Sequence, residues 1–186
     1  MTPGLDAGPC LLQQRTPIDP DEDAGELEKR LASLGADGVL QVIDQLETGT
    51  AKPIVQDKTL ASKAPRLTKE QGAIDWSRPA QAIKNQVRGI RPWPRAFTFW
   101  RHSSGEPVRL NVDRVAVLPA EGLDVANNSP PAPGTVIEAA TRLHVATGDM
   151  PLEILELQPA GKRAMSASEF LRGNRVAVGD TFGSAD

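Results

Sequence analysis

Basic side chains are concentrated in the middle third of the 186-residue chain, where they could bind phosphate groups. Residues 51–118 carry 13 bases and 5 acids, although the whole chain has a net charge of −3. Lys and Arg side chains that contact phosphates release counterions, so this distribution suggests a polyanionic partner. Pairing of these bases with the acidic first third of the chain is the alternative, and charge alone favours neither. The cations that could form a phosphate-facing stripe are Lys84, Arg88, Arg91 and Arg95.

Cysteine and histidine are too scarce for disulfide bonds or a standard zinc site. The single Cys and two His exclude a disulfide framework and a His/Cys zinc site of standard spacing, so we expect no metal. Cys10 stands among leucines with no base nearby in the sequence, which favours a small core residue over a nucleophile. We interpret His102 and His144 as ordinary surface or hydrogen-bonded histidines.

The sequence shows no membrane or export signal. Its longest apolar runs are only a handful of residues, and residues 1–6 contain no basic segment followed by an apolar one. We therefore expect no membrane span, no secretory signal and a cytoplasmic location.

The acidic N-terminal third predicts helices that need a partner layer. Apolar residues recur at helical spacing over 24–47, behind an acidic cluster that suits a helix N-terminus. Gly35 and Gly38 interrupt this pattern, which predicts two helices or one kinked helix. A short strand over 10–12 precedes them. Such helices normally pack on a sheet that this segment does not supply, so we expect them to be poorly packed in isolation.

The remainder of the chain predicts a helix followed by a small β-barrel. Ser77 is placed to cap the helix, and Ser166 with Glu169 forms a capping box for a last helix. Trp76 and Trp93 are expected to pack the first helix onto the barrel rather than to stack on bases. Short segments of alternating polarity, separated by turn residues, favour an OB-like barrel. The five candidate strands cover 96–101, 107–118, 133–139, 142–147 and 152–158.

Several motifs, in order along nearly the whole chain, resemble those of bacterial methionyl-tRNA formyltransferases. The first motif is shared with other folate-dependent formyltransferases, whereas the last, together with the Trp-Pro element, is characteristic of the tRNA-formylating branch. The motifs are GLDAGP at 4–9, LTKEQGAIDW at 67–76, RGIRPWP at 88–94, PGTV at 133–136, VATGD at 145–149 and LQPAGKRAMSA at 157–167.

The resemblance implies an enzyme that transfers a formyl group from 10-formyltetrahydrofolate to the amino group of methionyl initiator tRNA. It implies an α+β chain in three parts. Residues 1–48 are the C-terminal remnant of a Rossmann-like catalytic domain, 49–75 are a linker, and 76–186 are an OB-like tRNA-binding domain. Asp6 matches the family's catalytic Asp, which can orient an imidazole and assist proton movement as the amine attacks the formyl carbon.

The chain departs from the family at several positions. Nothing in it matches the family's catalytic Asn and His or its Ser-Leu-Leu-Pro folate loop, so we expect the chain to be inactive alone. Ala7 replaces a usual Thr, and Arg91 and Arg95 stand where the family more often has Asn and Gly. The change at Arg95 puts the local turn in doubt if glycine is used there for its backbone freedom.

Three functions remain open at this point. The first is part of a methionyl-tRNA formyltransferase, a monomer with initiator Met-tRNA as its partner. The second is a stand-alone RNA-binding module. The third is a related folate-dependent formyltransferase acting on a sugar nucleotide or small amine. The motif residues 162–167 argue against this third function. The residues expected to contact tRNA are Lys69, which is the first choice, and Lys84, Arg88, Arg91, Arg95, Lys162 and Arg163.

Overall fold

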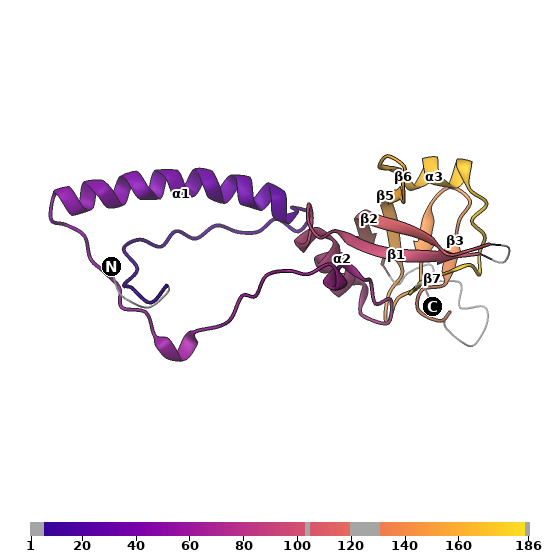
Figure 1. Cartoon of the computed structure of the whole chain (residues 1–186), viewed down its shortest axis with the longest axis horizontal. Coiled ribbons are helices and arrows are strands. Elements are labelled where there is room, and N and C mark those ends of the chain that lie inside the picture. Colours follow the sequence, from indigo (N-terminus) through magenta and orange to yellow (C-terminus); the bar gives the residue numbers. More distant parts are fainter. Residues whose placement is uncertain (1–5, 103–104, 120–130, 185–186) are drawn as a thin grey trace. The chain divides into compact units, whose positions relative to one another are not determined.

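The computed structural model describes residues 6–102, 105–119 and 131–184. Its contacts divide the chain into two compact units, residues 1–66 and 67–186, which are described separately here. The division falls inside the segment that the sequence predicts as a linker, 49–75. Figure 1 shows a single long helix in the first unit and a barrel of strands in the second. None of the helices in the described residues combines the length and apolar composition needed to cross a bilayer.

The first unit contains one uninterrupted helix, α1 (Ala24–Glu47), so the prediction of two helices or a kinked one is wrong. Each interior glycine costs a helix about 1 kcal/mol relative to alanine, which α1 tolerates. Gly38 has a packing role, because a Cβ there would lie 3.3 Å from a methyl carbon of Leu12. Gly35 has no neighbour that a Cβ would meet.

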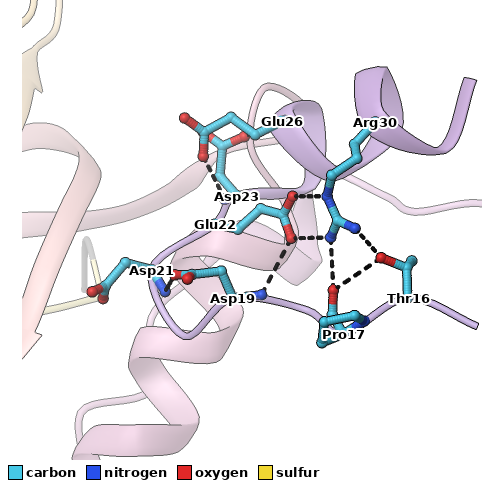
Figure 2. Close-up of polar contacts among 8 residues, drawn as sticks. All are labelled: Thr16, Pro17, Asp19, Asp21, Glu22, Asp23, Glu26 and Arg30. Carbon is cyan, nitrogen blue, oxygen red and sulfur yellow. Dashed lines mark hydrogen bonds and ion pairs between the residues drawn. The ribbon is translucent and has the colours of Figure 1, made fainter. Parts of the chain in front are cut away.

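The N-terminus of α1 is fixed by the acidic cluster, as the sequence predicts. The Asp23 carboxylate accepts a hydrogen bond from the Glu26 backbone N–H (2.9 Å), and the Glu26 carboxylate accepts one from the Asp23 N–H (2.9 Å). Arg30 then ties the helix to the preceding loop (Figure 2). Its guanidinium donates to the Glu22 carboxylate at 2.8 and 2.9 Å and to the Pro17 carbonyl at 2.8 Å.

The rest of the first unit holds little regular structure. Cys10 makes a single antiparallel bridge to Ile54, with both backbone hydrogen bonds at 2.8 Å, so the predicted strand over 10–12 is wrong. A short 3₁₀ turn, η1, spans Lys58–Leu60. In α1 only Gly38 is buried; Leu27, Leu34 and Val42 are half-buried, and the other large apolar side chains are exposed, in agreement with the expectation of poor packing. These exposed residues are Leu31, Val39, Leu40, Ile43 and Leu46.

The second unit is a small α+β domain, and all five predicted strands are present. Two very short strands, β6 and β7, are additional. The elements are η2 (Glu70–Gly72), α2 (Ala80–Gly89), β1 (Ala96–Arg101), β2 (Val108–Val117), β3 (Val136–Glu138), β4 (Leu143–Val145), β5 (Leu152–Pro159), β6 (Met165–Ser166), α3 (Ala167–Gly173) and β7 (Thr181–Gly183).

The strands form a nearly closed antiparallel barrel. Hydrogen-bonded neighbours follow the order β3-β4-β5-β2-β1-β7, and β6 pairs with β5. The two ends of this order meet, because Thr135 bridges Thr181 and the Phe182 N–H donates to the Gly134 carbonyl at 2.7 Å. A Cβ on Gly134 would lie 2.3 Å from that strand's backbone, at the Phe182 carbonyl oxygen, so the closure requires glycine. The predicted barrel is confirmed, whereas the Rossmann-like origin of 1–48 stays a prediction.

Helix α2 covers the barrel with the apolar face that its sequence predicts. Ile83 and Val87 are buried against the barrel core. Trp76 is also buried, and its indole N–H donates to the Thr98 hydroxyl at 3.0 Å, as expected for a packing residue. The same prediction for Trp93 is wrong, since its side chain is 55% exposed. Trp93 follows the end of α2, in a turn beyond the face that the helix buries.

The N-terminus of α2 is capped from a distant loop rather than by Ser77. The Asp149 carboxylate accepts a hydrogen bond from the Ala80 N–H at 2.8 Å, while the Ser77 hydroxyl donates to Asp75 at 2.6 Å. The hydrogen bond from Ala80 is the main cause that lowers the pKa of Asp149 below its ordinary value. Gly148 allows this approach, because a Cβ there would lie 2.0 Å from the Ser77 carbonyl oxygen. Helix α3 has the predicted Ser166 cap, whose hydroxyl accepts from the Glu169 N–H at 3.2 Å.

Candidate nucleic-acid interface

One pocket of the barrel unit combines an exposed aromatic ring with cations and amides. Its volume is about 350 Å³. The lining comes from the residue before η2, from the turn after α2, from β2, and from the end of β5 and the residue that follows it. The lining residues are Lys69, Trp93, Pro94, Arg109, Asn111, Gln158 and Ala160. We call this site the Trp93 pocket.

The floor of the Trp93 pocket is built by strand register. Asn111 on β2 lies opposite Phe97 on β1 and opposite Gln158 on β5, so these three residues form a row across the sheet. Arg109 is two positions before Asn111 and therefore faces the same side of β2. Its guanidinium carbon lies 4.0 Å from the centre of the Phe97 ring, a cation–π contact that fixes the charge above the sheet.

Arg95 holds the Gln158 side chain of this floor in place. It adopts a left-handed backbone conformation (φ 71°), as expected where the family more often has glycine. Its guanidinium donates two hydrogen bonds to Asp113 Oδ1 (2.7 and 3.0 Å) and one to Asp113 Oδ2 (2.5 Å). It also donates to the Gln158 side-chain oxygen at 2.6 Å. Gln158 in turn donates its amide N–H to the Lys162 carbonyl oxygen at 2.6 Å. Arg95 is thus engaged by the protein and orients the Gln158 amide.

Lys69 reaches the pocket because the segment that carries it is tied to the barrel. The Ile74 N–H donates to the Phe97 carbonyl at 2.9 Å, and the Gln86 side chain donates to the Ala73 carbonyl at 2.9 Å. A hydrogen bond from the Thr68 side chain is the largest cause that lowers the pKa of the neighbouring Glu70. Glu70 thus brings one carboxylate next to the Lys69 ammonium, whose charge also lowers the pKa of Glu70.

The structure brings together some of the predicted tRNA contacts and separates others. Lys69 lines the Trp93 pocket, and Arg95 and Lys162 are connected to it through Gln158. Lys84, Arg88 and Arg91 belong to α2 and the turn after it and do not line the pocket. Arg163 forms an ion pair with the Glu169 carboxylate. Because this carboxylate is turned to Arg163, it does not accept a hydrogen bond from the Ser166 N–H, and only the Ser166 half of the capping box predicted for α3 is formed.

Arg109 was not among the predicted contacts. The signal for it was available, because Arg109 and Asn111 alternate with the buried Leu110 and Val112 along the predicted strand 107–118. Such alternation places them on the outer face of the sheet. The sequence could not show that Trp93 and Lys69 would reach that face, because this depends on how η2 and the turn after α2 pack.

Asp6 lies in the first unit and is exposed, while Gly4 and Leu5 of its motif lie outside the described residues. Its backbone carbonyl accepts a hydrogen bond from the Gln56 side chain at 2.9 Å. Both histidines belong to the second unit: His102 packs on the Trp100 ring, and His144 pairs with Glu138 at 3.0 Å. Within the described residues, no three His, Cys, Asp or Glu side chains come together as a metal site would require.

Residues 66–175 match the family described as formyl transferase, C-terminal domain. The match covers more than half of the chain and includes the barrel from Lys69 to α3. The chain therefore belongs to the formyl transferase C-terminal domain family.

Solved structures share this fold at low sequence identity. HypX from Aquifex aeolicus is 16% identical with a TM-score of 0.59, and the match covers 91% of this chain and 29% of HypX. The N-formyltransferase from Helicobacter canadensis, solved with folinic acid and dTDP-3-aminofucose, is 15% identical with a TM-score of 0.57 (83% and 52% covered). The sugar 3N-formyltransferase WlaRD, solved with dTDP and 5-N-formyl-THF, is 16% identical with a TM-score of 0.57 (88% and 53% covered). The chain spans about half of these sugar enzymes and under a third of HypX.

Proposed function

We propose that this chain is the RNA-binding part of a formyltransferase that transfers a formyl group from 10-formyltetrahydrofolate to the amino group of methionyl initiator tRNA. The observation that carries the proposal is the Trp93 pocket, where Lys69 and Arg109 accompany an exposed aromatic ring. Cations that face outward around an aromatic platform suit a nucleic-acid strand. The sequence motifs at 88–94 and 157–167, which resemble the tRNA-formylating branch, provide two walls of this pocket.

The reaction proposed for the whole enzyme is an acyl transfer. The methionyl amine attacks the formyl carbon, a carbon–nitrogen bond forms, and the bond from that carbon to N10 of the folate breaks. The amine loses one proton, and N10 of tetrahydrofolate gains one. By its resemblance to the family, Asp6 assists this proton movement. The chain contains no match to the family's catalytic Asn and His, so we expect it to bind tRNA without formylating it.

A salt series of tRNA binding tests the proposal. The purified chain is titrated with methionyl initiator tRNA from 50 to 200 mM salt, with elongator Met-tRNA as the matched competitor. We expect tighter binding of the initiator form and a slope of log K against log salt of about −0.9 per phosphate contacted. Binding that does not depend on salt, or that does not distinguish the two tRNAs, would contradict the proposal.

A sugar nucleotide is the second candidate substrate. Two structures with this fold are sugar N-formyltransferases whose crystals contained dTDP or a dTDP-sugar. The same chain is therefore titrated with a dTDP-linked amino sugar by calorimetry. Saturable binding of this compound, with no binding of either tRNA, would replace the tRNA proposal by the sugar-nucleotide one.

A further inference from the structure

Trp93 differs from the other two tryptophans of the chain in its exposure. Trp76 and Trp100 are 4% and 5% exposed, and both indole N–H groups donate hydrogen bonds, to Thr98 and Asp180. Trp93 is 55% exposed, and its position between Pro92 and Pro94 limits the backbone freedom of the turn that holds it. An exposed indole in a restrained turn offers a flat apolar surface at low conformational cost.

The groups around Trp93 suit the parts of a nucleotide. Lys69 and Arg109 bring two positive charges to the pocket, and none of its lining residues among those described is a carboxylate, although Glu70 follows Lys69 in the chain. Within the described residues the Asn111 side chain makes no hydrogen bond, so its amide can donate to and accept from a base edge. Gln158, by contrast, already bonds Arg95 and Lys162, which fixes the wall beside Asn111.

We infer that the Trp93 pocket binds one unpaired nucleotide, with its base stacked on Trp93, its edge on Asn111 and its phosphate near Lys69 and Arg109. A base can stack on a side chain only when it has left its own helix, so the site selects single-stranded or splayed-out nucleotides. A pocket of about 350 Å³ is at the lower end of the range for small-ligand sites, which fits one nucleotide rather than a duplex. The source of this nucleotide is an RNA strand, and in this respect the inference rests on the proposed function.

Tryptophan fluorescence tests the inference directly. Since Trp76 and Trp100 are buried, quenching by a short unpaired oligoribonucleotide, such as a uridine or adenosine tetramer, reports mainly on Trp93. The full 186-residue chain is compared with Trp93→Ala and Trp93→Phe. Stacking predicts a loss of affinity of about five-fold or more for Trp93→Ala and a smaller loss for Trp93→Phe, which keeps an aromatic face. The Ala variant has no quenching signal of its own, so its affinity is measured by anisotropy of a labelled tetramer.

The charge part of the site has a matched control. Arg109→Ala and Lys69→Ala should each weaken tetramer binding and reduce the salt slope by about 0.7, the value per phosphate for single strands. Arg142→Ala removes the same charge near Glu153 at the other end of β5 and should leave both quantities unchanged. Because the side chains of Lys69, Trp93, Arg109 and Arg142 are all exposed, the unfolding midpoint measured by near-ultraviolet circular dichroism should be nearly unchanged in every variant.

The outcomes separate this inference from the proposed function. If initiator tRNA binds with the expected salt slope but Trp93→Ala binds the tetramer like the wild type, the inference is overturned and the proposed function stands. If the tetramer binds through Trp93 while the two tRNAs are not distinguished, the pocket is supported and the proposed function fails. If free dTDP binds as tightly as the tetramer, an RNA strand as the source is overturned.

Discussion

The carboxylate of Asp149 caps a helix that begins 69 residues earlier, and its removal should destabilise the barrel measurably. Asp149 Oδ1 accepts hydrogen bonds from the Ala80 N–H (2.8 Å), the Met150 N–H (2.6 Å) and the Thr147 hydroxyl (3.2 Å). Loss of an N-cap costs about 1 kcal/mol, and the two local bonds raise our expectation for Asp149→Ala to about 1.5–2 kcal/mol. For a unit of this size that free energy lowers Tm by about 5–8 °C.

Ser77, which the sequence predicts as the cap of α2, supplies the control variant. If Ser77 capped α2, Ser77→Ala would cost about 1 kcal/mol, whereas its exposed bond to Asp75 predicts less than about 0.5 kcal/mol. Asp149→Asn keeps an acceptor oxygen and loses only the charge at the helix N-terminus, so we expect a cost of about 0.5 kcal/mol. The assay is urea unfolding followed by tryptophan fluorescence, which reports on the barrel unit alone because residues 1–66 contain no Trp.

The same variants have a pH signature. The hydrogen bond from Ala80 lowers the pKa of Asp149, so the folded protein binds this proton less tightly than the unfolded chain. The stability that Asp149 provides is therefore complete above the unfolded pKa of about 4 and is lost as the pH falls through the folded value. The difference between wild type and Asp149→Asn should shrink below about pH 4. Equal stability of wild type and Asp149→Ala at pH 7, or a Ser77→Ala cost as large as that of Asp149→Ala, would refute the distant cap.

Three further outcomes follow from the packing. Arg95→Ala should lower the free energy of unfolding by about 2–3 kcal/mol in the same urea assay, because it leaves the Asp113 carboxylate, 5% exposed, without its partner. Arg95→Gly should be about 1 kcal/mol more stable than Arg95→Ala, because glycine adopts the left-handed backbone conformation of this position without strain. Equal stability of the two variants would argue against backbone strain. Gly134→Ala should lower Tm by more than 10 °C, since its Cβ would meet the Phe182 carbonyl, and a normal Tm would contradict the closure. Amide hydrogens of α1, where only Gly38 is buried, should exchange much faster than those of β2; equal protection by mass spectrometry would show that α1 is well packed.

Much of the barrel could be predicted from the sequence because its strands and α2 carry strong periodicity. The prediction for β1 matches the structure to the residue, and that for β2 is within one residue at each end. Strands β6 and β7 were missed because two or three residues are too few to show alternation. The break predicted at Gly35 and Gly38 was wrong because the flanking residues favour helix strongly enough to continue through both glycines.

The candidate site was predictable only in part. Lys69 could be chosen from its motif, and the unusual backbone at Arg95 could be anticipated from the replaced glycine. The exposure of Trp93 could not be predicted, because large aromatic residues are usually buried. It depends on how the turn after α2 packs, which only the structure reveals. The contribution of Arg109 depends on which strands are neighbours, and this information is absent from local spacing.

The barrel is completed by residues that no motif marks. The family match ends at residue 175, whereas β7 follows at Thr181–Gly183 and pairs both with β1 and with the residues that lead into β3. A fragment cut at residue 175 would keep the barrel motifs yet leave the backbone of β1 and β3 as two open edges. Unpaired edges attract strands from other molecules, so such a fragment would be prone to aggregate. The three residues of β7 thus cover the two backbone edges at which we expect such a fragment to associate.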